Sequence, residues 1–111
     1  MRYYETTFIV TPQLEDDKIE EVIKKVENII KNKGVIKLID RWGKKKLAYP
    51  IANQQYGFYV HIQFEADGSV VEKLEREYKL NEGIIRYLTV RVDKKLLKLR
   101  EMEEEKAEIT Q

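Results

Sequence analysis

The hydrophobic pattern of this 111-residue chain alternates between the two-residue period of a strand and the 3.6-residue period of a helix. The segments with a strand period are 3–10, 35–49, 58–64 and 87–92, and the segments with a helix period are 15–33 and 68–78. Read in order, they give β-α-β-β-α-β. This order predicts an α+β ferredoxin-like sandwich, in which two helices pack on one face of a four-stranded antiparallel sheet.

The phases of the strands predict one buried and one open face of the sheet. We expect these residues on the buried face: Tyr4, Thr6, Phe8, Val10, Phe58, Val60, Ile62, Phe64, Leu88, Val90 and Val92. The open face should carry Tyr3, Glu5, Thr7, Tyr59, His61, Gln63, Tyr87, Thr89 and Arg91. This second set is too polar for a core and too aromatic for an inert surface, so we expect it to contact a partner.

Local signals mark the boundaries of these segments. Gly34 should end the first helix, and Gly43 should mark a bend or bulge in the long strand that follows. Ser69 and Glu72 have the spacing of a capping box, which predicts the start of the second helix at Gly68.

Length and charge limit the organisation of the chain. Residues 1–93 are predicted to form one domain, and 94–111 a charged C-terminal tail that is either helical or disordered. The formal net charge is only +1, so any nucleic-acid binding must come from local clusters of lysine and arginine. No stretch has the length and hydrophobicity of a membrane span, so we expect a cytoplasmic protein with no membrane partner.

The residues that enzymes use are scarce. The chain has no cysteine, its single histidine is His61, and its five glycines are scattered singly. A lone histidine in a strand is far more often a surface residue than a general base or a metal ligand. We therefore expect no catalytic residues, no metal, no cofactor and no small-molecule substrate.

Three consecutive lysines, Lys44, Lys45 and Lys46, are the most distinctive local feature. Gly43 and Pro50 fix the ends of this segment, while Trp42 and Tyr49 can anchor its backbone. An ordinary basic turn would also explain the three charges. Because the segment is anchored, we favour an ordered site for phosphate groups.

Further basic residues are predicted to join these lysines. Arg2 and Tyr3 open the first strand, and Arg86 and Arg91 belong to the last. In an antiparallel sheet of this topology, residues distant in sequence can converge at the same edge. Arginine and lysine beside tyrosine suit RNA, because guanidinium groups bind phosphates and aromatic rings stack on exposed bases. The predicted RNA-binding residues are Arg2, Tyr3, Lys44, Lys45, Lys46, Arg86 and Arg91.

The segment Trp42–Ile51, Trp-Gly-Lys-Lys-Lys-Leu-Ala-Tyr-Pro-Ile, resembles the signature of the bacterial small-subunit ribosomal protein six family. Met1–Glu5 resembles the start of that family, and Asn81–Arg91 resembles its last strand. The resemblance covers about the first 93 residues. It implies a ribosome-associated structural protein that binds the central domain of small-subunit ribosomal RNA together with small-subunit ribosomal protein eighteen.

The aromatic open face suggests where that second protein contacts the chain. Tyr49, Tyr59 and His61 are the predicted partner-binding residues. For any single residue, packing against a cross-strand neighbour is an equally good explanation. The near-neutral charge indicates that a more basic partner shares in binding the RNA.

Two other functions remain open at this stage. Tyr56–Val60 is weakly similar to the core of the RNA-recognition motif, a single-stranded RNA binder, and Phe8–Val10 could be its partner strand. The phases put Phe8 and Phe58 on the buried face, which leaves only Tyr3 and Tyr59 to stack on bases. The other alternative is a protein-interaction or regulatory module, since the fold alone does not define function.

Overall fold

The computed structural model describes the backbone of residues 1–51 and 54–93 and the side chains of residues 1–47 and 55–93. Its elements are β1 (Arg2–Val10), α1 (Asp16–Lys33), β2 (Val35–Ile51), β3 (Gln54–Ala66), α2 (Gly68–Leu80) and β4 (Ile84–Val92). This is the expected β-α-β-β-α-β order.

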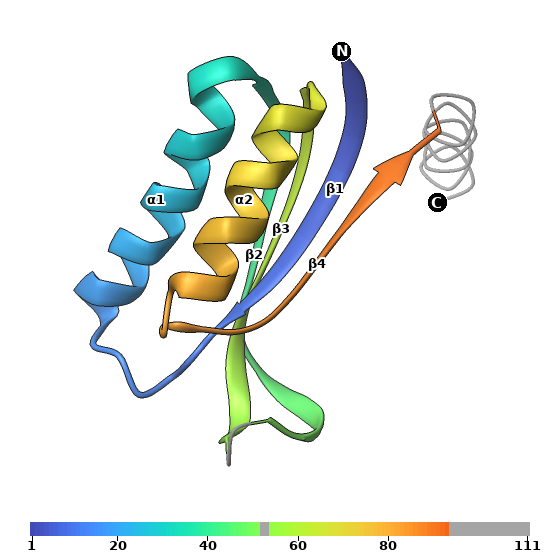
Figure 1. The fold of residues 1–111 in the computed structure, drawn as a ribbon. Helices are drawn as coiled ribbons and strands as arrows, with labels where there is room; N and C mark the ends of the chain where they lie inside the picture. The colour runs from blue at the N-terminus through green and yellow to red at the C-terminus, as the bar shows by residue number, and fades with distance from the viewer. Residues whose placement is uncertain (52–53, 94–111) are drawn as a thin grey trace, which may run out of the picture.

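The four strands form one antiparallel sheet in the order β2-β3-β1-β4. Both helices lie side by side on one face of this sheet, and the other face is open (Figure 1). The ferredoxin-like sandwich predicted from the periodicity is therefore confirmed.

The core lies between the helices and the sheet. The apolar stripe of α1 is buried as expected, and Val70, Leu74 and Tyr78 of α2 are 2% exposed or less. They pack on Phe8 of β1 and on Val60, Ile62 and Phe64 of β3. Burial of each such side chain stabilises the fold by about 1.5–3 kcal/mol, which is why these helices stay on the sheet.

A hydroxyl network crosses this core. Thr6 is fully buried, and its Oγ1 shares hydrogen bonds with the Tyr78 hydroxyl at 2.7 Å and with Thr89 Oγ1 at 2.8 Å. Burial raises the pKa of Tyr78 above its ordinary value, although the hydrogen bond to Thr6 opposes that shift. Every hydroxyl of the network has a partner, so the polar atoms can be buried at little cost.

The predicted phase of β4 is wrong at Leu88 and Val90. The side chains of Leu88 and Val90 are 65% and 43% exposed and lie on the open face. Tyr87 and Thr89, predicted to be outside, lie on the helix side, and the Tyr87 ring stacks on Tyr78 with 4.9 Å between centroids. The pairing of Tyr4 with Arg91 turns Arg91 toward that side as well. The pairing of Tyr3 with Val92 places Val92 on the open-face side, like Leu88 and Val90, although Val92 is only 7% exposed.

α2 begins at Gly68 as predicted, but its cap differs from the predicted capping box. Its N-cap is Asp67, whose carboxylate accepts a hydrogen bond from the Ser69 backbone N–H at 2.9 Å, so Ser69 is not the cap of a capping box. The hydrogen bonds from Ser69 lower the pKa of Asp67. By contrast, the prediction for Gly43 is confirmed, because the β2–β3 register shifts between Arg41 and Gly43, and Gly43 has a φ of 73°.

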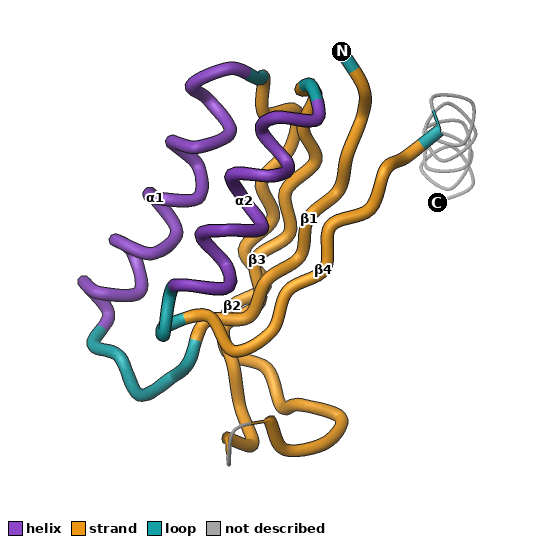
Figure 2. The backbone as a smooth tube through the Cα atoms, viewed as in Figure 1, coloured by secondary structure: helices purple, strands orange, loops and turns teal. Residues whose placement is uncertain are grey.

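The β2–β3 hairpin is longer than the rest of the sheet. β3 pairs with β1 only from Phe58 to Ala66, so residues 54–57 extend with β2 beyond the ends of β1 and β4 (Figure 2). Gly57 lies against Ile9 at the base of this extension and has no room for a side chain, because a Cβ there would lie 2.3 Å from Ile9 Cγ2. Because it extends past the ends of β1 and β4, the tip of the hairpin lies away from the helices.

Among residues 1–51 and 54–93, no helix is long and apolar enough to cross a membrane. The same part of the chain contains no group of three His, Cys, Asp or Glu side chains placed to bind a metal ion.

Candidate functional site

The residues predicted to bind RNA fall into two groups at opposite ends of the sheet. Arg2, Tyr3 and Arg91 form the first group, because Tyr3 of β1 pairs with Val92 of β4. With Met1, Val92 and Asp93 they line a hollow of about 470 Å³. Arg2 and Arg91 are both exposed, so two guanidinium groups are available to an anion at this end.

The three lysines form the second group, on the β2–β3 hairpin. Lys44, Lys45 and Lys46 are all exposed and pair with Phe58, Gly57 and Tyr56, as the expected ordered strand requires. Successive side chains of a strand alternate between its faces, so Lys44 and Lys46 share one face and Lys45 lies on the other. The Lys44 ammonium lies 5.4 Å from the centre of the Tyr56 ring, which holds it in place. The three charges thus lie on both faces of the hairpin and do not share a single face.

Arg86 belongs to the hairpin end. Arg86 of β4 pairs with Ile9 of β1, Ile9 pairs with Tyr59 of β3, and Tyr59 pairs with Gly43 of β2. Arg86 and the start of the lysine segment therefore lie in the same row across the sheet. The first group lies seven to eight residues farther along β1, a distance of about 25 Å. The predicted convergence of all the basic residues at a single site does not occur in this structure.

Arg41, next to the lysine segment, forms ion pairs within the protein, with Glu20 and Glu27 of α1. Its guanidinium donates to both carboxylate oxygens of Glu20, at 2.7 and 2.8 Å, and to Glu27 at 3.5 Å. The hydrogen bond to Glu20 raises the pKa of Arg41, and the charges of both carboxylates add to the shift. This cation ties β2 to α1 and is not available to bind RNA in the same way as its lysine neighbours.

An aromatic cluster occupies the open face near β2. The Trp42 ring stacks on His61 with 5.8 Å between centroids and an angle of 9°, and it lies 6.0 Å from the Tyr59 ring. Trp42 Nε1 donates to the Asp40 carboxylate at 2.7 Å, and His61 Nδ1 shares a 2.8 Å hydrogen bond with Thr7. Tyr59 and His61 therefore both contact Trp42 on the open face, whereas the side chain of Tyr49 lies outside the described residues.

Polar side chains run along the middle of the open face and link β1 to β3. Gln63 donates to Glu5 at 3.3 Å, parallel to the contact between His61 and Thr7. Because these groups already bond to one another, a protein that covers the face leaves few of them without a partner.

Apolar side chains border this polar centre on the outer strands. Leu38 and Trp42 of β2 are 47% and 45% exposed, and Leu88 and Val90 of β4 border the other side. We call these four residues the apolar margins. Large apolar side chains on both sides of a hydrogen-bonded centre are typical of a surface that binds another protein.

Sequence reasoning missed the apolar margins as binding residues. Trp42 was predicted only to anchor the backbone, and Leu88 and Val90 were predicted to be buried. The register of β1 against β4 was the missing signal, since it alone decides which face each β4 side chain occupies.

The fold and this surface define a class of small α+β sandwich in which one face of the sheet is left open. The model of the ribosomal protein S6 family matches residues 3–91. The small ribosomal subunit protein bS6 of Thermoanaerobacter pseudethanolicus is 44% identical over 94 residues, which cover 84% of this chain and 99% of that protein. Its namesake from Bacteroides fragilis is 44% identical over 95 residues, covering 85% and 83%.

The same relationship appears in three dimensions. The crystal structure of 30S ribosomal protein S6 from Thermotoga maritima superposes with a TM-score of 0.78 at 29% identity, covering 99% of this chain and 98% of that one. The chain belongs to the ribosomal protein S6 family. Membership makes it a ribosomal protein and not an enzyme, in agreement with the scarcity of catalytic residue types.

Proposed function

We propose that this chain is a structural constituent of the small ribosomal subunit that binds the central domain of its RNA together with small-subunit ribosomal protein eighteen. The family match over residues 3–91 is the observation that carries this proposal. The separation of basic and apolar surfaces supports it, because RNA and a second protein can then bind at the same time.

The two basic groups are the proposed contacts with RNA. Lys44, Lys45 and Lys46 project from the hairpin, and Arg2 and Arg91 flank the hollow at the other end. Cations at two ends, about 25 Å apart, suit two separate stretches of phosphate backbone. Tyr3 lies at the hollow and can stack on an unpaired base.

The open face is the proposed contact with ribosomal protein eighteen. Trp42, with Tyr59 and His61 packed against it, supplies the aromatic anchor, and the apolar margins supply area that water would leave on docking. The partner would also contribute positive charge, which this chain, with a net charge of +1, lacks in bulk.

The geometry does not favour an RNA-recognition motif. Phe8 is fully buried, and Tyr3 and Tyr59 lie six residues apart along the sheet, or about 20 Å. Two rings at that distance cannot stack on adjacent bases, and the Tyr59 ring already packs against Trp42. Family membership likewise argues against a general regulatory module.

A binding experiment with purified components tests the proposal. We expect a central-domain fragment of small-subunit ribosomal RNA to bind the chain tightly only when ribosomal protein eighteen is present. An RNA of equal length and unrelated sequence is the control. Tight binding of the chain alone would overturn the shared mode of binding, and no binding with the partner present would overturn the function.

A further inference from the structure

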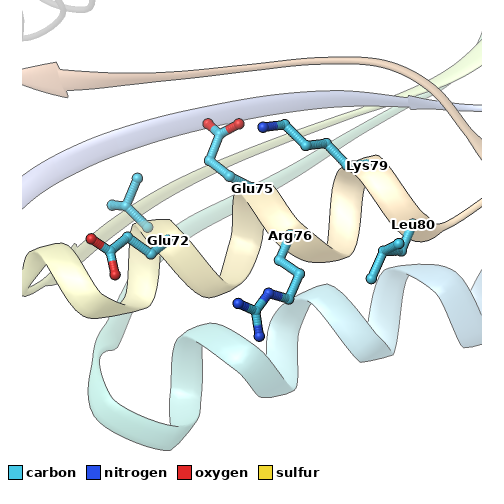
Figure 3. Close-up of a pocket in the computed structure, with 6 residues that line it drawn as sticks. Glu72, Glu75, Arg76, Lys79 and Leu80 are labelled. Carbon is cyan, nitrogen blue, oxygen red and sulfur yellow. The ribbon is translucent and has the colours of Figure 1, made fainter.

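The outer face of α2, on the side of the molecule opposite the open sheet face, carries a hollow of about 500 Å³. It is lined by Val71, Glu72, Glu75, Arg76, Lys79 and Leu80 (Figure 3). Leu80 is 73% exposed, more than any other large apolar side chain in the described part of the chain. We call this surface the α2 groove.

The charges of the α2 groove are arranged in order along the helix. Glu72 and Glu75 lie toward its N-terminal half, and Arg76 and Lys79 toward its C-terminal half. A ligand that matches this order must present positive charge first and negative charge second, with apolar side chains between them.

The chain following β4 begins close to the N-terminal end of this groove. Val92 pairs with Tyr3, and Tyr3 pairs with Glu65, which lies just before Asp67, the N-cap of α2. Figure 1 shows that β4 and α2 run in opposite directions, so β4 ends at the level where α2 begins. A segment that turns back at Asp93 therefore meets the acidic half of the groove first.

Residues 94–111 carry their charges in the matching order. Four cations come first and the anions follow, with apolar residues interspersed: Lys94, Lys95, Lys98 and Arg100, then Glu101, Glu103, Glu104, Glu105 and Glu108, with Leu96, Leu97, Leu99 and Met102 among them. Lys106 is the one cation within the anionic half. We propose that residues 94–111 dock in the α2 groove, parallel to α2, with the lysines beside Glu72 and Glu75 and the glutamates beside Arg76 and Lys79.

The length of the segment is sufficient for this docking. The α2 groove spans about 14 Å at the 1.5 Å rise of a helix, and 18 residues span about 27 Å even at that compact rise. Because the segment is covalently joined to β4 at Asp93, its effective concentration at the groove is high. The entropic cost of closing the short connecting loop is correspondingly small. The docked segment leaves the open sheet face free, so this inference is independent of the proposed function.

Paramagnetic broadening in the full-length chain tests the proposal. The chain has no cysteine, so Glu104→Cys gives a single site for a nitroxide label. We expect strong broadening of the amide signals of Arg76, Lys79 and Leu80 and none at Thr7 or Leu88. Broadening on the open face, or weak uniform broadening everywhere, would overturn the docking.

A pair of matched substitutions links the broadening to the groove. Leu80→Glu should abolish it, because a carboxylate replaces the exposed apolar side chain beside the glutamates. Leu88→Glu makes the same change at a leucine that is 65% exposed in the other layer, and it should retain the broadening. Unchanged core signals in both variants confirm folding, and broadening that survives Leu80→Glu contradicts the proposed site.

Discussion

Two aromatic residues, Tyr78 and Trp42, differ in role because one is buried in the core and the other is exposed on the sheet surface. Tyr78 brings a hydroxyl into the core, and Thr6 and Thr89 complete its hydrogen-bond network. Trp42 lies on the surface and gathers Tyr59 and His61 around its ring. The first arrangement stabilises the fold, and the second is proposed to bind a partner.

Tyr78→Phe should lower the free energy of unfolding by about 1 kcal/mol at neutral pH. The hydroxyl contact to Thr6 is lost, while Thr6 keeps its bond to Thr89. Urea denaturation measures the difference between the variant and the wild type.

The same pair of proteins should differ in alkaline solution. The raised pKa of Tyr78 means that the folded chain keeps the phenol protonated where the unfolded chain, with a value near 10.0, releases the proton. The contribution of the Tyr78 hydroxyl to the free energy of unfolding is therefore fully present below pH 10, and it is lost as the pH rises above that value. The gap between wild type and Tyr78→Phe should therefore narrow above pH 10, and a constant gap would contradict the assignment.

Trp42→Ala should weaken binding of ribosomal protein eighteen by about 2 kcal/mol, or roughly 30-fold, because it removes the centre of the aromatic cluster. Isothermal titration calorimetry measures the change. Tyr56→Ala is the matched control, since Tyr56 is 43% exposed but lies on the hairpin with Lys44. Equal losses for the two variants would remove the cluster from the interface.

At the scale of elements, periodicity predicts most of this fold. The stripe of α1 and the alternation of β1 and β3 each place their residues correctly, because a helix or strand with one buried face has only one favourable phase. β4 fails this reasoning. On its helix side, Tyr87 stacks on the Tyr78 ring and Thr89 bonds to Thr6, while Leu88 and Val90 stay exposed on the open face.

The candidate site was predictable only in part for a similar reason. The lysine run and the pair Tyr59 and His61 are visible as local patterns, and the structure places them on the hairpin and the open face. The division of the basic residues between two ends depends on strand register, which is a long-range property of the sheet.

Replacing Lys44, Lys45 and Lys46 together by Ala should leave the fold nearly intact and lower the log–log salt slope of RNA binding by up to about three. Lys44 and Lys46 lie on one face of the hairpin and Lys45 on the other. Replacing only Lys44 and Lys46 therefore measures the contribution of one face to RNA binding. The control replaces Lys24, Lys33 and Lys73, which are exposed on the helices. A slope that changes equally in the control would mean that the hairpin has no special contact with phosphates.

Gly43→Ala should destabilise the protein by about 1 kcal/mol, because its φ of 73° is unfavourable for any residue with a Cβ. Gly68→Ala is a matched control. At both positions no described atom lies within 4 Å of the added Cβ, but only Gly43 has a positive φ. Thermal or urea unfolding compares the two, and equal stabilities would show that the bulge tolerates alanine.

The whole molecule keeps its exposed apolar surface apart from its two basic groups. The apolar margins lie on the open face, the cations lie at the two ends of the sheet, and the helices cover the other side. A chain with a net charge of +1 can in this way present strong local positive charge without a basic surface overall.

This separation predicts additive effects on RNA binding. Arg2→Ala with Arg91→Ala affects one end of the sheet, and the lysine substitutions affect the other, about 25 Å away. The losses in binding free energy should add within about 0.5 kcal/mol, since the two groups share no contact. A double-mutant cycle on the complex with RNA and partner measures the coupling, and a large coupling energy would indicate one continuous contact.

The irregular pairing of β2 also affects the free chain. β2 is an outer strand of the sheet, and its register against β3 shifts near Lys37, near Trp42 and again between Lys46 and Ile51. A strand whose register is interrupted three times and that is rich in lysine is a poor template for another strand, so sheets of neighbouring molecules cannot easily join there. Before it binds a partner, a newly made molecule exposes leucine and tryptophan on the open face. The irregular β2 edge should then limit aggregation by strand pairing along this side of the sheet.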